Sequence, residues 1–281
     1  MNTINNILQL GSKILKNHSI KTYQIDTELL LSKTLKKSRE YILTNDNKTL
    51  NYRETKNFLK FLNRRKNNEP IAYIMNEKYF WKKKFFVDNN VLIPRPDSET
   101  VVEKVLSYYK HKKKISILDI GTGSGCLIIS ILGERKYFKG TAIDISKKAI
   151  NIAKYNAKMH QLSNRIKFYK SSVDNFFKGK YDLIISNPPY ICSSKLKYLD
   201  KDIYNFEPIQ ALEGGKNGLK FFEKIIKKSS KLLKKGGRLT LEIGFDQKNK
   251  VLEIINKENF FVNNVYKDYG KNDRCIICTK L

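Results

Sequence analysis

The residues with the clearest chemical potential are Asn187, Pro188, Pro189 and Tyr190, which follow directly after the strand-like run Tyr181–Ile185. The prolines carry no N–H group, so the backbone here offers carbonyl oxygens only. The Asn187 amide adds another acceptor, and two converging acceptors suit an NH2 group. Tyr190 offers a flat face on which a planar group can stack. The motif therefore predicts a substrate clamp for an amide or aromatic amine, with Asn187, Pro188 and Tyr190 as catalytic residues.

Such a clamp favours the transfer of a carbon group to the bound nitrogen. An amide nitrogen is a poor nucleophile because its lone pair is delocalised. Accepting hydrogen bonds from both of its N–H groups favours a pyramidal nitrogen and exposes that lone pair. The remaining contribution is to place the nitrogen in line with an activated methyl carbon. No general base is needed before the transfer, because the proton can leave afterwards.

A glycine-rich turn and a later aspartate predict a nucleoside cofactor beside this clamp. The turn consists of Gly121, Thr122, Gly123, Ser124 and Gly125. Glycines at such a turn let the backbone approach a ligand closely. The G-x-G-x-G spacing differs from the dinucleotide fingerprint, and the absence of a following G-K-[ST] excludes a P-loop. Asp144, which ends the next predicted strand, is placed to accept hydrogen bonds from both ribose hydroxyls.

These motifs lie at the ends of strands in a pattern of alternating strands and helices. The predicted strands are Ile115–Ile120, Thr141–Ile145, Ile166–Tyr169, Tyr181–Ser186, Arg238–Ile243, Phe261–Tyr266 and Cys275–Thr279. The alternation predicts an α/β domain over residues 97–281 with a doubly wound, mostly parallel seven-stranded sheet. The last two strands are joined by a short turn and should be antiparallel. Helical spacing predicts an N-terminal helical, substrate-binding domain over residues 1–75. Aromatic runs around the turn cluster Asp88–Asn90 predict a β-hairpin linker over residues 76–96.

Composition narrows the possible partners. The formal net charge is +28, but only 9 of the 55 basic residues are Arg, which specific phosphate and base recognition favours. We attribute the charge to compositional bias and expect no stable nucleic-acid partner. Cys275 and Cys278 have C-x-x-C spacing without a second pair, so no metal site is predicted. No secretory signal or membrane-length apolar run is present, which predicts a cytoplasmic protein.

With these motifs, the chain resembles the class I S-adenosylmethionine-dependent methyltransferases, and within them the release-factor glutamine methyltransferases. The shared segments are DTELLL (26–31), EPIAY (69–73), LIPRPDSE (92–99), LDIGTGSG (118–125), SNPPYI (186–191), FEP (206–208) and DYGKNDR (268–274). Sister enzymes that methylate a ribosomal-protein glutamine usually have a different sequence after the Pro-Arg of the third segment.

The resemblance implies methylation, with S-adenosyl-L-methionine, of the glutamine in the Gly-Gly-Gln motif of class I peptide chain release factors, giving N5-methylglutamine. By position, Gly121–Gly125 would hold the methionyl end of the cofactor, Asp144 its ribose and Asn187–Tyr190 the glutamine amide. Asn187 is also counted among the residues expected to contact the cofactor. The family often has an Asp and an aromatic residue beside the adenine. Here Ser172 and Val173 align with the Asp and the aromatic residue, or Asp174 aligns with the Asp if the alignment slips by two. Val173 is the predicted contact with the adenine.

Three other interpretations remain. An adenine-N6 nucleic-acid methyltransferase could use the same clamp for an adenine amine, although no large insert for target recognition interrupts the α/β half. A ribosomal-protein glutamine methyltransferase is the second. A binding module with the same fold is the third, but it would be expected to have lost Asn187 or the glycines, which are all present. We expect a monomer.

Overall fold

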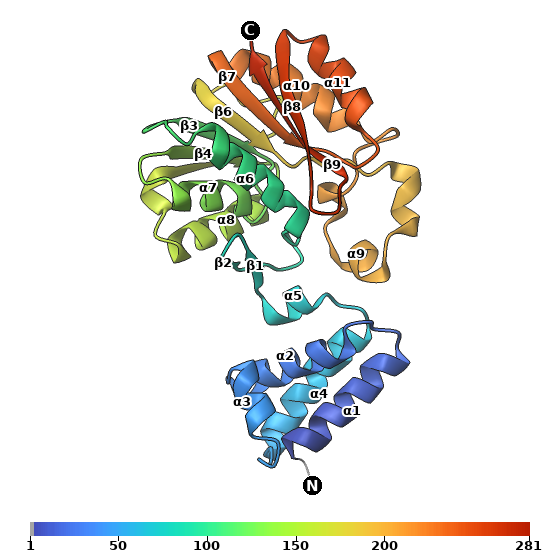
Figure 1. Ribbon diagram of the computed structural model, residues 1–281. Coiled ribbons are helices and arrows are strands. Elements are labelled where there is room, and N and C mark those ends of the chain that lie inside the picture. Colours follow the sequence, from blue (N-terminus) through green and yellow to red (C-terminus); the bar gives the residue numbers. More distant parts are fainter. Residues whose placement is uncertain (1–2) are drawn as a thin grey trace. The chain divides into compact units, whose positions relative to one another are not determined.

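The computed structural model describes residues 3–281, which divide into two compact units (Figure 1). The first unit holds the chain up to Glu77 together with Asp200–Phe206, and the second holds Lys78–Leu199 with Glu207–Leu281. The short helix α9 (Lys201–Phe206) therefore belongs to the first unit although it lies far along the chain.

The rest of the first unit is also helical, as the spacing of its apolar residues predicts. Its helices are α1 (Ile4–Asn17), α2 (Tyr23–Leu35), α3 (Arg39–Thr44), α4 (Tyr52–Lys66) and α5 (Ile71–Met75). A capping box between Asn51 and Glu54 begins α4. Gly11 lets α1 approach α2, because a Cβ there would lie 2.6 Å from the Cγ2 atom of Thr27. The apolar faces of these helices meet in one core.

Two of the family-like segments hold this unit together. Asp26 on α2 is buried and accepts a 2.7 Å hydrogen bond from Nε of Arg65 on α4. Glu69, just after α4, pairs with Arg64 through two hydrogen bonds. The Asp26–Arg65 pair fixes α2 against α4, because a buried charge without its partner is costly.

The second unit is built on the predicted doubly wound, seven-stranded sheet. Its strands are β3 (Ser116–Ile120), β4 (Lys139–Asp144), β5 (Ile166–Lys170), β6 (Tyr181–Ser186), β7 (Leu233–Glu242), β8 (Phe260–Lys267) and β9 (Asp273–Lys280). They are ordered β5-β4-β3-β6-β7-β9-β8. The pairs from β5 to β7 are parallel, and β9 runs antiparallel to both β7 and β8. The predicted fold class and the antiparallel last pair are thereby confirmed.

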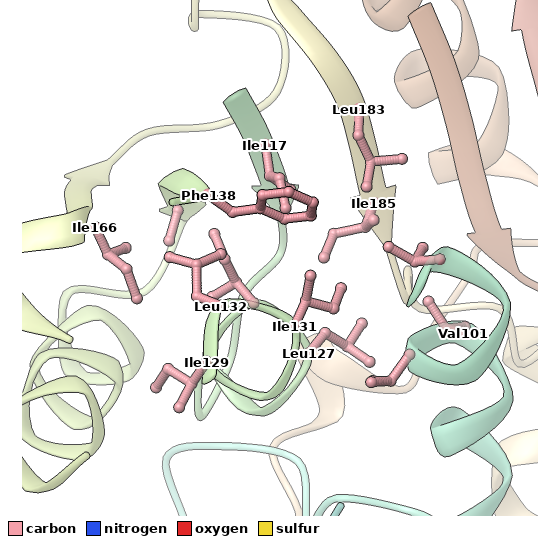
Figure 2. Close-up of a cluster of buried hydrophobic side chains, with 14 of the residues drawn as sticks. Val101, Ile117, Leu127, Ile129, Ile131, Leu132, Phe138, Ile166, Leu183 and Ile185 are labelled. Atoms are coloured by element: carbon pink, nitrogen blue, oxygen red, sulfur yellow. The ribbon is translucent and has the colours of Figure 1, made fainter. Parts of the chain in front are cut away.

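Helices cover both faces of the sheet (Figure 1). They are α6 (Glu99–Tyr108), α7 (Cys126–Glu134), α8 (Lys147–Met159), α10 (Lys220–Leu232) and α11 (Lys248–Asn256). Leu183 and Ile185 of β6 belong to the core under α6 and α7, which Figure 2 shows, whereas Ile184 faces α10. Cys275 and Cys278 likewise fall in opposite cores. Their C-x-x-C spacing therefore directs the two thiols to different sides of the sheet.

The hairpin near the start of this unit differs from the sequence prediction in the position of its turn. Strands β1 (Lys78–Phe80) and β2 (Lys83–Phe85) are joined at Trp81 and Lys82, not at Asp88–Asn90. Both turn residues have positive φ, 45° and 61°, as a tight hairpin of this length requires. Tertiary contacts of the tryptophan hold this unfavourable turn, since its backbone N–H donates to Glu99 on α6.

Candidate active site

A cavity of about 540 Å³ lies at the carboxyl ends of the central parallel strands. Its walls are the segments that follow four strands, with parts of two loops. The main lining segments are 120–124 at the end of β3, 143–146 at the end of β4, 171–174 after β5, 186–189 at the end of β6, 90–95 and 208–213. Ser98 and residues of α10 (Lys220, Phe221, Lys224 and Ile225) also line the cavity. Doubly wound sheets bind ligands at this edge, and the volume is typical of a small-molecule site.

The glycine turn forms the wall after β3, and its three glycines have different roles. Gly121, Gly123 and Gly125 all adopt the left-handed conformation, with φ of 73°, 53° and 82°. A Cβ at either of the first two would meet no protein atom within 4 Å, so this face of the turn is open. A Cβ at Gly125 would instead lie 2.8 Å from Cδ1 of Ile129 and 3.3 Å from Cβ of Ala153. The first two glycines therefore leave space for a ligand, and the third allows α7 and α8 to pack closely.

A buried carboxyl group lies beneath this turn. Thr122 donates a 2.7 Å hydrogen bond to Oδ2 of Asp119, and Oδ1 of the same residue has no hydrogen-bond partner within residues 3–281. Burial raises the pKa of Asp119 to about 7, and the nearby charge of Asp144 adds to the shift, although the Thr122 hydroxyl opposes it. When ionised, this carboxylate favours a cationic ligand group at the turn.

Asp144 lies in the cavity wall, where backbone groups fix its carboxylate. Oδ2 accepts from the Gly123 N–H at 2.9 Å, and Oδ1 accepts from the Ser146 N–H at 2.9 Å. Ser146 itself caps α8, as the sequence predicts. Burial raises the pKa of Asp144, and the backbone hydrogen bonds offset part of that rise. Each oxygen keeps a second lone pair, so the carboxylate is oriented and can still accept hydrogen bonds from a ligand.

The segment after β5 supplies the apolar part of the same wall. Val173 lines the cavity and packs against the core under α10. Asp174 also lines the cavity, and its carboxylate pairs with Lys224 at 2.5 Å. The side chain of Val173 is therefore the better surface for a flat base, and its contact with the adenine stays a prediction.

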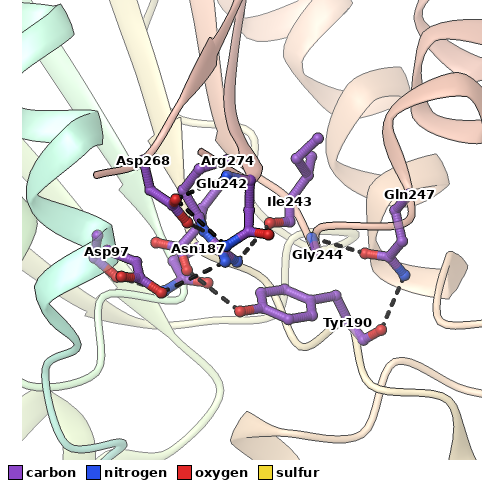
Figure 3. Close-up of polar contacts among 11 residues, drawn as sticks. Asp97, Asn187, Tyr190, Glu242, Ile243, Gly244, Gln247, Asp268 and Arg274 are labelled. Atoms are coloured by element: carbon purple, nitrogen blue, oxygen red, sulfur yellow. Dashed lines mark hydrogen bonds and ion pairs between the residues drawn. The ribbon is translucent and has the colours of Figure 1, made fainter. Parts of the chain in front are cut away.

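The structure brings three of the four predicted clamp residues into the cavity. Asn187, Pro188 and Pro189 line it, and Nδ2 of Asn187 donates a 3.2 Å hydrogen bond to Oγ of Ser98. The amide nitrogen thus has a protein partner, which leaves Oδ1 for the predicted acceptor role. Tyr190 is not part of the lining. Its ring packs against the core, and its hydroxyl donates to Oε1 of Glu242 at 3.4 Å (Figure 3).

A buried charged cluster lies behind the clamp (Figure 3). Arg274 donates from Nε to Asp268 at 3.0 Å and from Nη1 to the Ile243 carbonyl at 3.0 Å. Its Nη2 atom lies 3.4 Å from Oδ2 of Asp97. Two family-like segments, Asp-Tyr-Gly-Lys-Asn-Asp-Arg and Pro-Arg-Pro-Asp, therefore meet here, although their first residues, Asp268 and Pro94, are 174 positions apart.

Another pair joins the loops that border the cavity. Glu207 is buried, accepts a 3.1 Å hydrogen bond from the Ile93 N–H, and forms an ion pair with Arg95. Arg95 and Pro208 both line the cavity. The Phe-Glu-Pro segment thus holds the Pro-Arg-Pro segment in place.

Replacement of Glu207 by Gln is expected to lower the free energy of unfolding by about 1–2 kcal/mol, because the neutral amide no longer forms an ion pair with Arg95. The loss is limited because Arg95 is partly solvated. Denaturant unfolding measures this loss. The matched control is Glu103→Gln, which removes an exposed ion pair with Lys104. Equal losses for the two variants would contradict a role for Glu207 in holding the loops.

Two positioning residues had no assigned role in the sequence. Ser98 holds the Asn187 amide, and Asn156 on α8 donates to the Ser124 carbonyl at 2.8 Å and exchanges two hydrogen bonds with the Phe86 backbone. Asn156 thereby ties the glycine turn to the segment after the hairpin. It could have been found as a polar residue on an otherwise apolar helix face. Ser98 has no comparable local signal.

In the described part of the chain, no helix is long and apolar enough to cross a membrane. The same residues contain no group of three or more His, Cys, Asp or Glu side chains placed to hold a metal ion.

A class I methyltransferase is defined by this sheet order together with the glycine turn, the aspartate at the end of β4 and the Asn-Pro-Pro-Tyr turn. Solved structures share this fold. A methyltransferase from Pyrococcus furiosus superposes with a TM-score of 0.53 at 21% identity, covering 70% of this chain and 88% of that one. The ribosomal protein L11 methylase from Lactobacillus delbrueckii subsp. bulgaricus has a TM-score of 0.51 at 18% identity, covering 69% and 84%.

Sequence relatives define the family more closely. Residues 111–276 match the model of a methyltransferase domain, and residues 6–75 match that of the PrmC N-terminal domain. The chain is 41% identical to the release factor glutamine methyltransferase of Buchnera aphidicola subsp. Baizongia pistaciae and 39% identical to that of Clostridium botulinum, with 99% of both chains covered in each case. It belongs to the release factor glutamine methyltransferase family, as the sequence resemblance predicts.

Proposed function

We propose that this protein transfers a methyl group from S-adenosyl-L-methionine to the glutamine side-chain amide of the Gly-Gly-Gln motif in class I peptide chain release factors, giving N5-methylglutamine. The observation that carries the proposal is the Asn187 amide, whose nitrogen is held by Ser98 at the edge of the cavity. Its oxygen is thereby left to accept a hydrogen bond from a substrate NH2 group. Membership of the family supports the choice of substrate.

The cavity fits the cofactor. The open faces of Gly121 and Gly123 accept the methionyl end, and the acidic Asp119 beneath them suits its cationic groups. The Asp144 carboxylate, already oriented by two backbone N–H groups, keeps lone pairs for the ribose hydroxyls. Val173 would contact the adenine. When bound, the cofactor supplies a methyl carbon activated by an adjacent sulfonium.

The clamp residues prepare the substrate nitrogen. The Asn187 oxygen and a backbone carbonyl of the proline pair accept its two N–H groups, which draws the lone pair out of conjugation. The prolines fix the backbone there, because their φ angles are locked. Pro188 is buried and lines the cavity, so it adds an apolar surface to this side of the site. The proton is released after transfer, and in this scheme Tyr190 supports the clamp from behind.

Other parts of the proposal rest on the family. The first unit, most of which matches the PrmC N-terminal domain, would help to bind the release factor. Release factors act in translation, which places the reaction in the cytoplasm, and we propose a monomeric enzyme without a stable nucleic-acid partner. The relatives give no support to an adenine-N6 or a ribosomal-protein glutamine methyltransferase.

Intact-mass analysis tests the reaction and the substrate together. A purified class I release factor is incubated with this protein and S-adenosyl-L-methionine, and the gain of one methyl group is mapped to the Gly-Gly-Gln peptide. A release factor whose glutamine is replaced by glutamate is the control and should gain nothing. Methyl transfer to added RNA or DNA, with none to the release factor, would overturn the proposal.

A further inference from the structure

The edge of the sheet opposite the cavity carries a concentration of lysines. Three segments there lead into the adjacent strands β3, β6 and β7, namely 110–114, 178–182 and 231–235. In Figure 1 this is the edge near the mark C, because β9 runs antiparallel to β7 and ends there. The three segments contain nine lysines, all exposed, and one acidic residue, Asp182. These nine lysines are called the basic edge below.

Short contacts hold the three segments side by side. Ser116, the first residue of β3, donates from its backbone N–H to Oδ2 of Asp182 at 2.7 Å. Oδ1 of Asp182 accepts from Nζ of Lys234 at 2.8 Å, and Nζ of Lys180 donates to the Lys231 carbonyl at 2.5 Å. The one carboxylate of these segments therefore joins them and offsets one of nine positive charges.

The concentration exceeds what a lysine-rich composition places at random. An even spread of the net +28 over 281 residues would give about +1.5 in any fifteen of them, whereas these fifteen carry +8. The cavity lies at the other end of the same strands, and its lining holds three basic and three acidic side chains. The excess charge is thus concentrated at the edge away from the site.

The chemistry of the basic edge fits a chain of phosphates. Lysine ammonium groups are flexible point charges, which bind phosphate without fixed geometry, and a nucleic-acid backbone offers one such charge per nucleotide whatever its sequence. The three apolar residues of these segments, Tyr181, Leu232 and Leu233, are buried. The fifteen residues therefore offer charge without the apolar contacts that protein interfaces and membrane-binding helices use.

We propose that the basic edge binds the phosphate backbone of RNA through weak, sequence-independent contacts. The expected Kd is about 1–100 μM at physiological salt, as for non-specific nucleic-acid binding, so no stable complex forms. β6 runs from Tyr181 at the basic edge to Ser186 at the cavity, so RNA bound at one end leaves the other open. The contact would raise the concentration of the protein near RNA-rich assemblies. It does not depend on the proposed function.

Fluorescence anisotropy of a short, labelled single-stranded RNA of mixed sequence tests the inference, with the full chain titrated at several salt concentrations. The loop variant combines Lys110→Gln, Lys112→Gln, Lys113→Gln and Lys114→Gln, which lie in an exposed loop before β3. Its Kd at low salt should rise by about 10- to 100-fold. The slope of log K against log salt should become shallower by about 2–3, because each lost phosphate contact contributes roughly 0.7.

The matched control makes the same change in net charge on another surface. It combines four exposed lysines of α8, as Lys147→Gln, Lys148→Gln, Lys154→Gln and Lys158→Gln. Its Kd should rise by less than about threefold, since salt screens charges that do not contact the RNA. Both variants should keep the denaturant midpoint of the wild type, which shows that they are folded.

Four results would overturn the inference. The first is a wild type that does not bind the RNA at low salt, and the second is an equal loss in the loop variant and the α8 control. The third is lysine-dependent binding that is tighter to phosphatidylserine vesicles or to polyglutamate than to RNA. The fourth is a parallel loss of methylation of a free release factor in the loop variant, because the basic edge would then contact the protein substrate. A wild type that binds RNA but leaves release factors unmethylated would contradict the proposed function alone.

Discussion

Replacement of Asn187 by Ala is expected to lower the rate of methyl transfer by about 100- to 1000-fold, the range seen when one oriented hydrogen-bonding group is removed from an active site. The acceptor for one substrate N–H is lost, so the amide lone pair stays delocalised. Cofactor affinity should change little, since the glycine turn and Asp144 lie on other walls of the cavity. Single-turnover kinetics with a release factor, together with calorimetric titration of the cofactor, measure the two effects separately.

The matched control is Asn264→Ala on β8, the edge strand on the other side of the sheet from β5. Its turnover should equal that of the wild type. The clamp mechanism is wrong if Asn187→Ala turns over normally. Loss of cofactor binding in parallel with turnover would also count against it, because Asn187 would then act on the cofactor rather than on the substrate.

Replacement of Asp144 by Ala should weaken the binding of the cofactor and leave the transfer step nearly unchanged. The Kd for S-adenosyl-L-methionine is expected to rise by about 100-fold, since charge-assisted hydrogen bonds to the ribose hydroxyls are lost. The Gly123 N–H also loses the carboxylate oxygen 2.9 Å away, which loosens the glycine turn. At saturating cofactor, kcat should stay within a few fold of the wild-type value. Calorimetry and saturation kinetics check these expectations.

Asp174→Ala is the informative control, because Asp174 also lines the cavity but pairs with Lys224. It should weaken cofactor binding by less than about fivefold, as expected for the loss of a solvent-exposed ion pair. A loss as large as that in Asp144→Ala would contradict the placement of the adenine against Val173 and favour the alternative alignment at Asp174.

Local chemistry explains why much of the fold and part of the site are predictable. The strand at Tyr181–Ser186 and the alternation around it follow from apolar patterns a few residues long. The turn at Gly121–Gly125 follows from backbone conformations that only glycine adopts without strain. The position of the hairpin turn could not be predicted from local composition. Asp88–Asn90 has the stronger turn composition, yet the chain reverses at Trp81, because Glu99 binds the backbone there.

What the sequence by itself determined, then, is the order of strands and helices, the glycine turn and the proline-locked carbonyls, since each depends on neighbours along the chain. The tertiary structure alone decided which polar side chains meet behind them. Ser98 and Asn187 are 89 residues apart, and Tyr190 and Glu242 are 52 apart. The pattern of apolar residues along the chain cannot predict such pairs. Side chains from distant segments are brought together only when the sheet has formed and its loops have closed over one edge.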